Sequence, residues 1–374
     1  MPKIVIIGSY APSLINFRGH LIKSLVKSKY DVVACAPAFD ERTISELQFI
    51  GASYKEYSLH STGLNILWDF ISFCQILKIL KIEKPNIIFL YTIKPVIYGS
   101  IAAKLADVKS IYSLISGLGS TFVVYDWKSR VLNNFIIIMY KISLTFNKKI
   151  FFQNSDDLNL FFNKKLIKKT EKAILVNGSG VDLKFYHYEG NYPSKISFLL
   201  ISRMIREKGI YEFIEAAKIL KKDWKNLHFD IVGFFDDNVN KINTELLSEM
   251  NDQGIINFHG STTDVRPFIR NSSIYVLPSF YREGIPRSIL EAMSMGRPII
   301  TTSLPGCKET VIQGENGFLV SPKSVSSLVE AMIFFIKNPE AIPRMGYKSR
   351  KIAEKKFNVH TVNQTILKEM NIRY

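Results

Sequence analysis

The sequence predicts an α/β protein made of two doubly wound parallel sheets. Short β-branched runs alternate with amphipathic stretches along most of the chain, which is the rhythm of strand–helix–strand units. The runs are almost continuously apolar, as strands covered by helices on both faces require. A chain of 374 residues with 47% hydrophobic content is also long enough for two buried cores.

The individual elements follow this rhythm in order. In the first half we expect a strand at 3–8, a helix at 17–29, strands at 31–36 and 86–91, and a helix at 96–106. The rhythm pauses at 177–182 and restarts with a strand at 195–202, a helix at 210–221, strands at 227–233, 255–259, 274–277 and 298–302, and helices after Ser324. We therefore expect domains at residues 1–185 and 186–374, with the final helix a candidate to pack back on the first domain.

Ligands of open parallel sheets bind beyond the carboxyl ends of the strands. Two such sheets facing each other would form a cleft with binding loops on both walls. A donor on one wall and an acceptor on the other would suit a group-transfer enzyme.

The charge is strongly basic and unevenly distributed. The net charge is +16, and residues 1–185 contain 24 Lys and Arg against 13 Asp and Glu, whereas residues 186–374 contain 25 against 20. Such an excess fits an anionic membrane surface or a phosphorylated substrate, and a solvated lysine-rich surface explains it equally well. A nucleic-acid-binding protein would need interleaved aromatic and basic residues or a known binding module, and the sequence has neither.

Cysteine use and hydropathy exclude several classes of protein. Cys35, Cys74 and Cys307 stand far apart without a C-x-x-C pair, which argues against a disulfide framework or a structural zinc site and fits a reducing cytoplasm. The first ten residues are too short in apolar sequence for a signal peptide. The apolar segments 64–80 and 131–146 are interrupted by charged and amide residues, so we expect no membrane-spanning helix.

Two motifs follow predicted strands and carry the chemistry. Arg203 and Lys208 lie between the strand at 195–202 and the helix at 210–221, where cations and a helix N-terminus together favour an anion. Such cations are also common on solvated surfaces. We expect a planar fork from Arg203 and a mobile charge from Lys208 on diphosphate oxygens.

The second motif, Tyr281-Arg282-Glu283-Gly284-Ile285-Pro286-Arg287-Ser288-Ile289-Leu290-Glu291, follows the strand at 274–277. Pro286 suits the first turn of a helix, with Glu283 just outside it and Glu291 inside. Both carboxylates are placed to reach one ligand and accept from sugar or ribose hydroxyls, while the amides of Gly284 and Ile285 suit a phosphate. By spacing alone, the favoured explanations are a helix N-terminal charge for Glu283 and a polar helix face for Glu291.

From Arg203 to Val320 the chain resembles the family 4 retaining glycosyltransferases of the GT-B fold, in which two Rossmann-like domains face each other. The ordered matches are Arg203 with Lys208-Gly209, Glu283-Gly284-Ile285-Pro286, Glu291-Ala292-Met293, Gly296-Arg297-Pro298-Ile299-Ile300, Pro305-Gly306 with Glu309, and Asn316-Gly317-Phe318-Leu319-Val320. The resemblance implies that Arg203 and Lys208 bind the donor diphosphate, Glu283 contacts the transferred sugar, and Glu291 holds the ribose. It also implies that the Gly284-Ile285-Pro286 turn contacts the donor and that the backbone at Gly260 and Ser261 holds the base.

The amino-terminal half resembles a narrower group of bacterial transferases that extend undecaprenyl-diphosphate-linked sugars in O-antigen, capsule or glycan assembly. The matching segments are 16–22, 91–95 with Tyr98-Gly99, and 116–120. They imply an acceptor side formed by Arg18, His20, Lys94, Ser116 and Gly117. Phe17 and Leu21 also fit an ordinary helix core, and a packed or surface position suits His20. Many relatives have a histidine or acidic residue where this chain has Ser116, so the acceptor-side group that assists catalysis stays open.

No metal or cofactor is expected at the donor site. The sequence contains no D-x-D pattern, and Asp236-Asp237 lies in a polar loop, so the cations and helix amides are expected to neutralise the diphosphate. The UDP-sugar is a substrate rather than a cofactor.

Taken with the resemblance, these features predict α-retaining transfer of an N-acetylhexosamine from a UDP-sugar to a sugar on undecaprenyl diphosphate. The enzyme is then expected to bind the cytoplasmic face of a bacterial inner membrane peripherally. N-acetylgalactosamine and an α1,3 linkage are implied only by similarity to lipid-linked N-acetylgalactosaminyltransferases. A nucleotide-sugar epimerase is the alternative enzyme, because the same two-domain fold hosts that chemistry.

Overall fold

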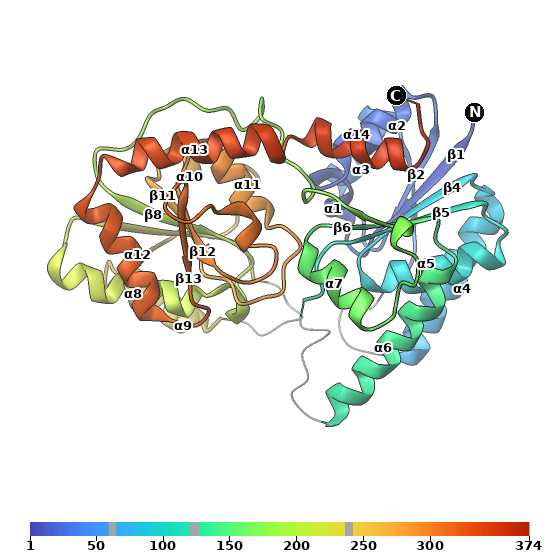
Figure 1. The fold of residues 1–374 in the computed structure, drawn as a ribbon, viewed down its shortest axis with the longest axis horizontal. Coiled ribbons are helices and arrows are strands. Elements are labelled where there is room, and N and C mark those ends of the chain that lie inside the picture. Colours follow the sequence, from blue (N-terminus) through green and yellow to red (C-terminus); the bar gives the residue numbers. More distant parts are fainter. Residues whose placement is uncertain (60–64, 120–126, 236–241, 374) are drawn as a thin grey trace. The chain divides into compact units, whose positions relative to one another are not determined.

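A computed structural model describes residues 1–59, 65–119, 127–235 and 242–373 of the chain. Its contacts divide the protein into two compact units, Met1–Ser179 with Val359–Tyr374, and Gly180–Asn358 (Figure 1). The division falls at residues 179 and 180, where the sequence analysis placed it at 185 and 186. The end of the chain groups with the first unit.

Backbone pairing explains why the division falls before Val181. The Val181 amide donates to the Phe357 carbonyl oxygen at 2.8 Å, and Val181 forms a β-bridge with Asn358. These bonds hold Val181, at the start of the second unit, against Phe357 and Asn358 at its end. All three residues therefore belong to the same unit. Helix α14 (Val359–Glu369) instead buries Val362 and Ile366 in the core of the first unit.

The first unit is built on a seven-stranded sheet in the order β3-β2-β1-β4-β5-β6-β7, and every adjacent pair is parallel. The strands are β1 (Lys3–Ile7), β2 (Asp31–Ala36), β3 (Ser53–Glu56), β4 (Ile87–Tyr91), β5 (Ser110–Ile115), β6 (Lys149–Phe152) and β7 (Ala173–Leu175). The chain reverses direction across the sheet between β3 and β4. This is the doubly wound parallel arrangement that the apolar runs predict.

Helices cover both faces of this sheet (Figure 1). On one face lie α1 (Ala11–Asn16), α2 (Gly19–Lys27), α3 (Glu41–Ile50) and α14, and on the other lie α4 (Ile66–Glu83), α5 (Ile93–Leu105), α6 (Trp127–Thr145) and α7 (Ser155–Asn163). The 3₁₀ turn η1 (Thr170–Lys172) leads into β7. Within the described ranges, no helix is both long and apolar enough to cross a membrane.

The second unit has a six-stranded parallel sheet in the order β10-β9-β8-β11-β12-β13. Its strands are β8 (Ser197–Ile201), β9 (His228–Val232), β10 (Asn257–Phe258), β11 (Ile274–Leu277), β12 (Ile299–Thr302) and β13 (Gly317–Val320). Its helices are α8 (Ile210–Asp223), α9 (Thr244–Asp252), α10 (Arg266–Arg270), α11 (Arg287–Ser294), α12 (Val325–Lys337) and α13 (Ala341–Lys356), with 3₁₀ turns η2 (Arg206–Lys208) and η3 (Lys308–Thr310). The two sheets confirm the predicted fold class.

A short helix that the sequence did not predict precedes the helix expected at 17–29. The expected helix is α2, which spans Gly19–Lys27, whereas α1 ends at Asn16 and is separated from α2 by Phe17 and Arg18. The Arg18 backbone between them has φ −122° and ψ −5°, outside the helical region. Arg18 is buried there with its guanidinium 5.2 Å from the centroid of the Tyr91 ring. A contact with a distant strand therefore accompanies the break.

Candidate functional site

The two motifs of the second unit meet because their strands are neighbours. Strand β8 pairs with β11 in parallel, with Phe198 opposite Ile274 and Leu199 opposite Tyr275. The carboxyl ends of parallel strands open at the same edge of a sheet, which is where ligands of such sheets bind. The segment with Arg203 leaves β8 at this edge, and the segment with Glu283 leaves β11 beside it.

Lys208 and Glu283 form an ion pair at this edge of the sheet. The Lys208 ammonium donates to Oε1 of Glu283, and both side chains are largely shielded from solvent. The Ser279 hydroxyl donates to the same carboxylate oxygen at 3.0 Å. The carboxylate is therefore held by one group from the segment after β8 and one from the segment after β11. Because the pair is shielded from solvent, its charge interactions are stronger than they would be in water.

The ring of Tyr281 lies beside both cations. The centre of the Arg203 guanidinium is 5.9 Å from the ring centroid, and the Lys208 ammonium is 5.6 Å from it. The Tyr281 amide donates to the Glu207 carbonyl oxygen at 3.1 Å, which ties the motif to η2. Burial raises the pKa of the Tyr281 phenol, so the ring stays neutral at pH 7. Sequence reasoning assigned no role to Tyr281, although it stands two residues before Glu283.

A glycine in a neighbouring loop supports the turn at Glu283. Gly306 has φ +84°, and a Cβ atom at this position would overlap the Gly284 carbonyl oxygen. Only glycine combines this backbone conformation with so close an approach of two main chains. The matched Pro305-Gly306 segment thus packs directly against the Glu283-Gly284 turn.

The turn leads into α11 through Pro286. Gly284, Ile285 and Pro286 are buried, and Pro286 is the N-cap residue of α11 rather than part of its first turn. The structure therefore starts the helix one residue later than the sequence suggested. Proline is tolerated at either place because neither position needs an amide donor inside the helix.

Glu291 is buried on α11 with two side-chain partners. The Tyr186 hydroxyl donates to Oε1 of Glu291 at 2.8 Å, and Nε of Arg287 donates to the same oxygen at 2.9 Å. Burial raises the pKa of the Glu291 carboxyl, and Arg287 opposes this shift. Sequence reasoning missed Tyr186, because it lies 105 residues before Glu291 and no local pattern marks it.

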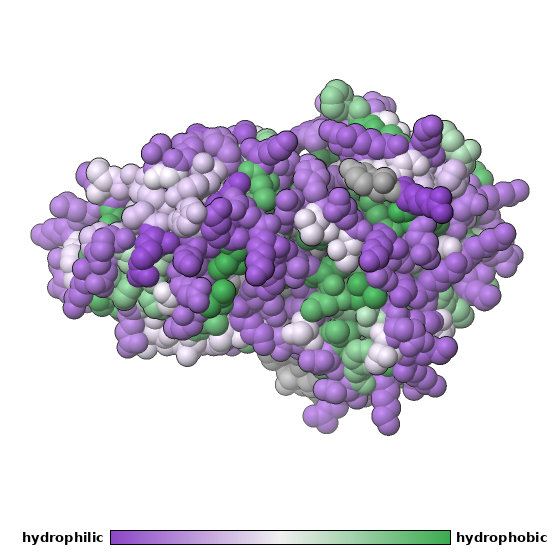
Figure 2. Space-filling model, turned by 45° about the horizontal axis from the view of Figure 1, so that its top comes forward, coloured by the Kyte–Doolittle hydropathy of each residue, from purple (hydrophilic) through white to green (hydrophobic). Residues whose placement is uncertain are grey.

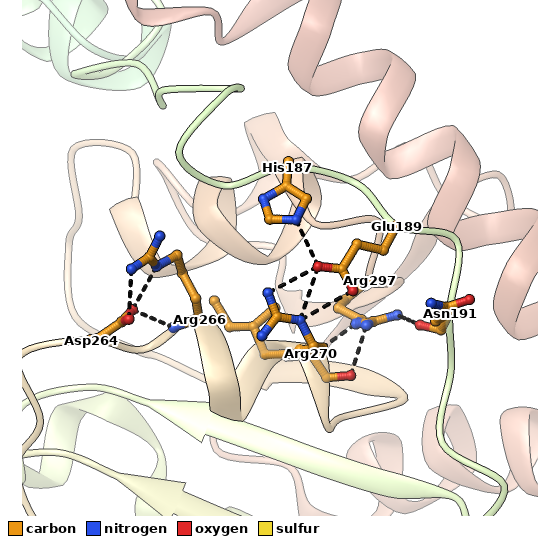
Figure 3. Close-up of polar contacts among 8 residues, drawn as sticks. His187, Glu189, Asn191, Asp264, Arg266, Arg270 and Arg297 are labelled. Atoms are coloured by element: carbon orange, nitrogen blue, oxygen red, sulfur yellow. Dashed lines mark hydrogen bonds and ion pairs between the residues drawn. The ribbon is translucent and has the colours of Figure 1, made fainter.

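The segment that carries Tyr186 is anchored by the polar network in Figure 3. The buried Arg297 guanidinium donates to the carbonyl oxygens of Ile269, Arg270 and Asn191 at 2.8–2.9 Å. Glu189 forms an ion pair with Arg270 at 2.9 Å (Figure 3). Arg297, one of the matched family positions, therefore stabilises the second unit by satisfying three carbonyl groups.

Gly260 and Ser261 follow β10 at the same edge of the sheet. The Gly233 amide donates to the Gly260 carbonyl oxygen at 2.8 Å, so the chain segments after β9 and β10 are tied together. Gly260 has φ +68° with open space around its Cα, and Ser261 is exposed. The structure thus places these backbone groups on the ligand-binding edge, with β9 and β8 between β10 and β11.

In the first unit, Lys94 lies in the first turn of α5, directly after β4. Its ammonium forms an ion pair of 2.7 Å with Asp69 of α4, and both groups are mostly buried. Thr92, two residues earlier, has φ 69° and ψ 159°, a conformation that is normally confined to glycine. Strained backbone of this kind concentrates at functional sites, so this strand end is a candidate binding position.

The other acceptor-side candidates follow two further strands, β1 and β5. Arg18 follows α1 and is buried against Tyr91, while His20 of α2 meets the His360 ring edge-on at 5.6 Å between centroids. Ser116 and Gly117 come directly after β5, and both are half-buried. Because β1, β4 and β5 are adjacent, all of these segments leave the same edge of the sheet.

A metal centre was not expected from the sequence. The described part of the chain contains no group of three or more His, Cys, Asp or Glu side chains arranged to hold an ion. Asp236 and Asp237, the adjacent carboxylates considered from the sequence, lie outside the described residues.

Two protein-family models match the chain. Residues 188–352 match the model described as "Glycosyl transferases group 1", and residues 14–154 match "Glycosyl transferase 4-like". The first match contains both motifs of the second unit, Arg203 with Lys208 and the segment from Tyr281 to Glu291. The second contains Arg18, His20, Lys94, Ser116 and Gly117.

Two curated relatives are similar over most of the chain. One is the N,N'-diacetylbacillosaminyl-diphospho-undecaprenol alpha-1,3-N-acetylgalactosaminyltransferase of Campylobacter jejuni, at 28% identity over 87% of each protein. The other is the UDP-Gal:alpha-D-GlcNAc-diphosphoundecaprenol alpha-1,3-galactosyltransferase of Escherichia coli, at 25% identity over 72% of this chain and 71% of the relative.

Solved structures share the fold over nearly the full length. Anabaena HepE in complex with UDP superimposes with a TM-score of 0.76 at 16% identity, covering 99% of this chain and 100% of HepE. Sucrose-phosphate synthase from Thermosynechococcus elongatus superimposes with a TM-score of 0.77 at 15% identity, covering 98% of each chain. At these identities the likeness establishes the two-domain GT-B fold.

Proposed function

The chain belongs to the glycosyltransferases, and we propose that it transfers an N-acetylhexosamine from a UDP-sugar to a sugar carried on undecaprenyl diphosphate. The anomeric configuration of the donor is retained in this proposal. N-acetylgalactosamine and an α1,3 linkage are the preferred assignment because of the similarity to the Campylobacter jejuni enzyme. The Escherichia coli relative has a lipid-linked diphosphate acceptor and a UDP-sugar donor in its name.

The observation that carries the proposal is the grouping of Arg203, Lys208 and Glu283 around Tyr281. It combines two cations with one carboxylate at the carboxyl edge of the sheet. The cations suit the two phosphates of a nucleotide diphosphate, and the carboxylate suits the hydroxyls of the attached sugar. A nucleotide-sugar therefore fits this grouping better than an uncharged sugar or a bare phosphate does.

The chemistry is then mainly electrostatic. The bond between the anomeric carbon and the diphosphate oxygen breaks, and the departing UDP takes the electron pair. The acceptor hydroxyl forms the new bond on the same face and gives its proton to the departing diphosphate oxygen. Arg203 and Lys208 stabilise the charge that develops on the diphosphate, while the buried surroundings keep competing water away.

The remaining donor contacts follow from the same placement. Glu291 is assigned to the ribose hydroxyls, with Tyr186 and Arg287 fixing its carboxylate. The turn at Gly284, Ile285 and Pro286 is assigned to the donor sugar and phosphate. Backbone groups at Gly260 and Ser261 are assigned to the base, because they lie on the same sheet edge.

Acceptor recognition is assigned to the strand ends of the first unit. Lys94 is the preferred diphosphate ligand, because it lies beside the strained backbone of Thr92. Arg18 is assigned a supporting role behind Tyr91, since it is 2% exposed. Ser116, Gly117 and His20 are assigned to the acceptor sugar.

The test is a product assay with purified protein, a panel of UDP-sugars and synthetic prenyl-diphosphate sugars. Mass spectrometry should detect one added N-acetylhexosamine on the lipid acceptor, and NMR should show an α linkage. An isomerised UDP-sugar formed without acceptor would instead identify a nucleotide-sugar epimerase. A β-linked product would contradict the retaining mechanism while leaving the transfer itself intact.

A further inference from the structure

Helix α6 carries a stripe of large apolar side chains on its exposed face. The stripe consists of Val131, Phe135, Ile138 and Ile142, which are 43–60% exposed. Their spacing of four, three and four residues places them on one side of the helix. The opposite side is already buried, with Tyr140 and Leu144 in the core of the first unit. A surface helix normally has polar residues on its outer side, so this exposed apolar stripe indicates an interaction surface.

Helix α4 repeats this arrangement in its first two turns. Ile66, Leu67, Trp68 and Phe70 are 46–78% exposed, although all four are large apolar residues. Further along the helix, Ile76 and Leu80 pack into the same core as Tyr140 and Leu144. Helix α4 is therefore apolar both toward the core and toward solvent.

The two exposed stripes lie on the same side of the sheet. Helix α5 packs against α4 and against α6, and all three helices cover the same core. The ion pair between Asp69 and Lys94 joins the first turns of α4 and α5. We define the α4–α6 face as the exposed apolar residues Ile66, Leu67, Trp68, Phe70, Val131, Phe135, Ile138 and Ile142. Figure 2 shows apolar patches, in green, at several places within a mostly purple exterior.

The exposed charges on helices α4 and α6 have one sign. Lys78 and Lys81 of α4 and Arg130 and Lys141 of α6 are exposed. The two carboxylates in the described parts of these helices are held in ion pairs, Asp69 with Lys94 and Glu83 with Lys3, each at 2.7 Å. Apolar side chains beside uncompensated cations match the interface of an anionic bilayer.

We propose that the α4–α6 face docks on the surface of an anionic lipid bilayer, with its apolar side chains in the interface and its cations at the lipid phosphates. This inference rests on the proposed function for the use of a lipid-linked acceptor. Lys94, the preferred acceptor ligand, lies on α5 between the two docking helices. A second copy of the chain is a poorer occupant, because a two-fold contact would bring like charges together.

Vesicle sedimentation tests the docking without either substrate. The full chain should pellet with vesicles of phosphatidylcholine and phosphatidylglycerol, and less with phosphatidylcholine alone. The double variant Phe70→Gln/Phe135→Gln should lower the partition coefficient by about tenfold or more, because two large apolar side chains no longer leave water. Arg130→Gln/Lys141→Gln should weaken binding to the anionic vesicles only, and salt should weaken it in the same way.

Phe49→Gln is the matched control. Phe49 is 90% exposed on α3, which covers the opposite face of the same sheet, so its replacement should leave vesicle binding unchanged. Circular dichroism and thermal melting establish that each variant is folded.

Three results would overturn the docking face. They are a wild-type chain that stays in the supernatant with anionic vesicles at low salt, equal binding by the Phe70→Gln/Phe135→Gln variant, and an equal loss in Phe49→Gln. Light scattering tests whether a second copy of the chain binds this face instead. A dimer that the Phe70→Gln/Phe135→Gln variant converts to monomer, with vesicle binding unchanged, would also overturn the proposed docking face. Transfer to a short-chain, water-soluble acceptor is measured separately, so a failed docking face and a failed transferase assignment give different results.

Discussion

Lys208 and Glu283 are 75 residues apart in the sequence and form an ion pair at the edge of one sheet. The pair exists because β8 and β11 are adjacent strands, so the segments that follow them open side by side. Tyr281 contributes a ring next to Lys208 and Arg203. The proposed donor site therefore consists of side chains that already hold one another in place, which reduces the reorganisation needed when a diphosphate binds.

Removing the Arg203 guanidinium should impair transfer. Arg203→Ala is expected to lower kcat/KM by about 100-fold or more, equivalent to about 2.7 kcal/mol, because a departing diphosphate needs a fixed cation. Arg206→Ala is the control, since Arg206 is an exposed cation in the same segment. Near-normal turnover of folded Arg203→Ala would remove the arginine from the site.

The Tyr281 ring should matter more than its hydroxyl. Tyr281→Phe retains the ring beside both cations and should keep activity close to wild type, whereas Tyr281→Leu should lower kcat/KM by about tenfold through the loss of two cation–π contacts. Steady-state kinetics of the two variants measure the difference. Equal activity of the leucine variant would show that Tyr281 does not position Arg203 and Lys208.

Glu291 should limit stability while supporting donor binding. Its folded-state pKa is raised by burial, so the folded protein binds this proton more tightly than the unfolded chain does. The resulting contribution to the free energy of unfolding is present below the unfolded pKa of about 4.3 and is lost as pH rises through the folded pKa. Above that window, the buried carboxylate lowers stability.

Glu291→Gln should therefore be at least as stable as wild type at pH 7 in thermal melts, because a neutral amide can still accept from Tyr186. Its affinity for UDP should fall by about tenfold or more, since hydrogen bonds to charged groups contribute roughly 1.5–3 kcal/mol. Titration calorimetry measures this loss. A strongly destabilised variant with unchanged UDP affinity would make Glu291 a purely structural residue.

Transfer is expected to proceed without a divalent metal. Arg203 and Lys208 already supply positive charge at the proposed diphosphate position. Activity should largely survive EDTA in an assay that measures glycolipid product. Loss of product with recovery on addition of magnesium or manganese would show that a metal, rather than these cations alone, stabilises the leaving group.

The fold could be predicted from the sequence where a local pattern of residues determines the element. The strands at 31–36 and 274–277 have the bounds found for β2 and β11, because each contains an apolar run that is followed directly by a proline. Helix α1 was not predicted from the sequence. The break that separates it from α2 coincides with the contact of Arg18 with Tyr91, which depends on how β4 is placed in the sheet.

The individual residues of the site could be predicted from the sequence, but the contacts between them could not. The motifs identified Lys208 and Glu283 as ligand groups, yet their pairing depends on a strand order that skips β9 and β10. Tyr186 was missed for the same reason, because a partner 105 residues away leaves no local signature. Long-range pairing in parallel sheets is set by topology rather than by neighbouring residues.

The most direct test of the account is the stoichiometry of one reaction. Purified protein is mixed with UDP-N-acetylgalactosamine and a prenyl-diphosphate-linked sugar, and the UDP released is measured against the glycolipid formed. Equal amounts of both products are expected, and both should fall in parallel in Arg203→Ala. Conversion of the UDP-sugar into an isomer, with the lipid acceptor unchanged, would contradict it.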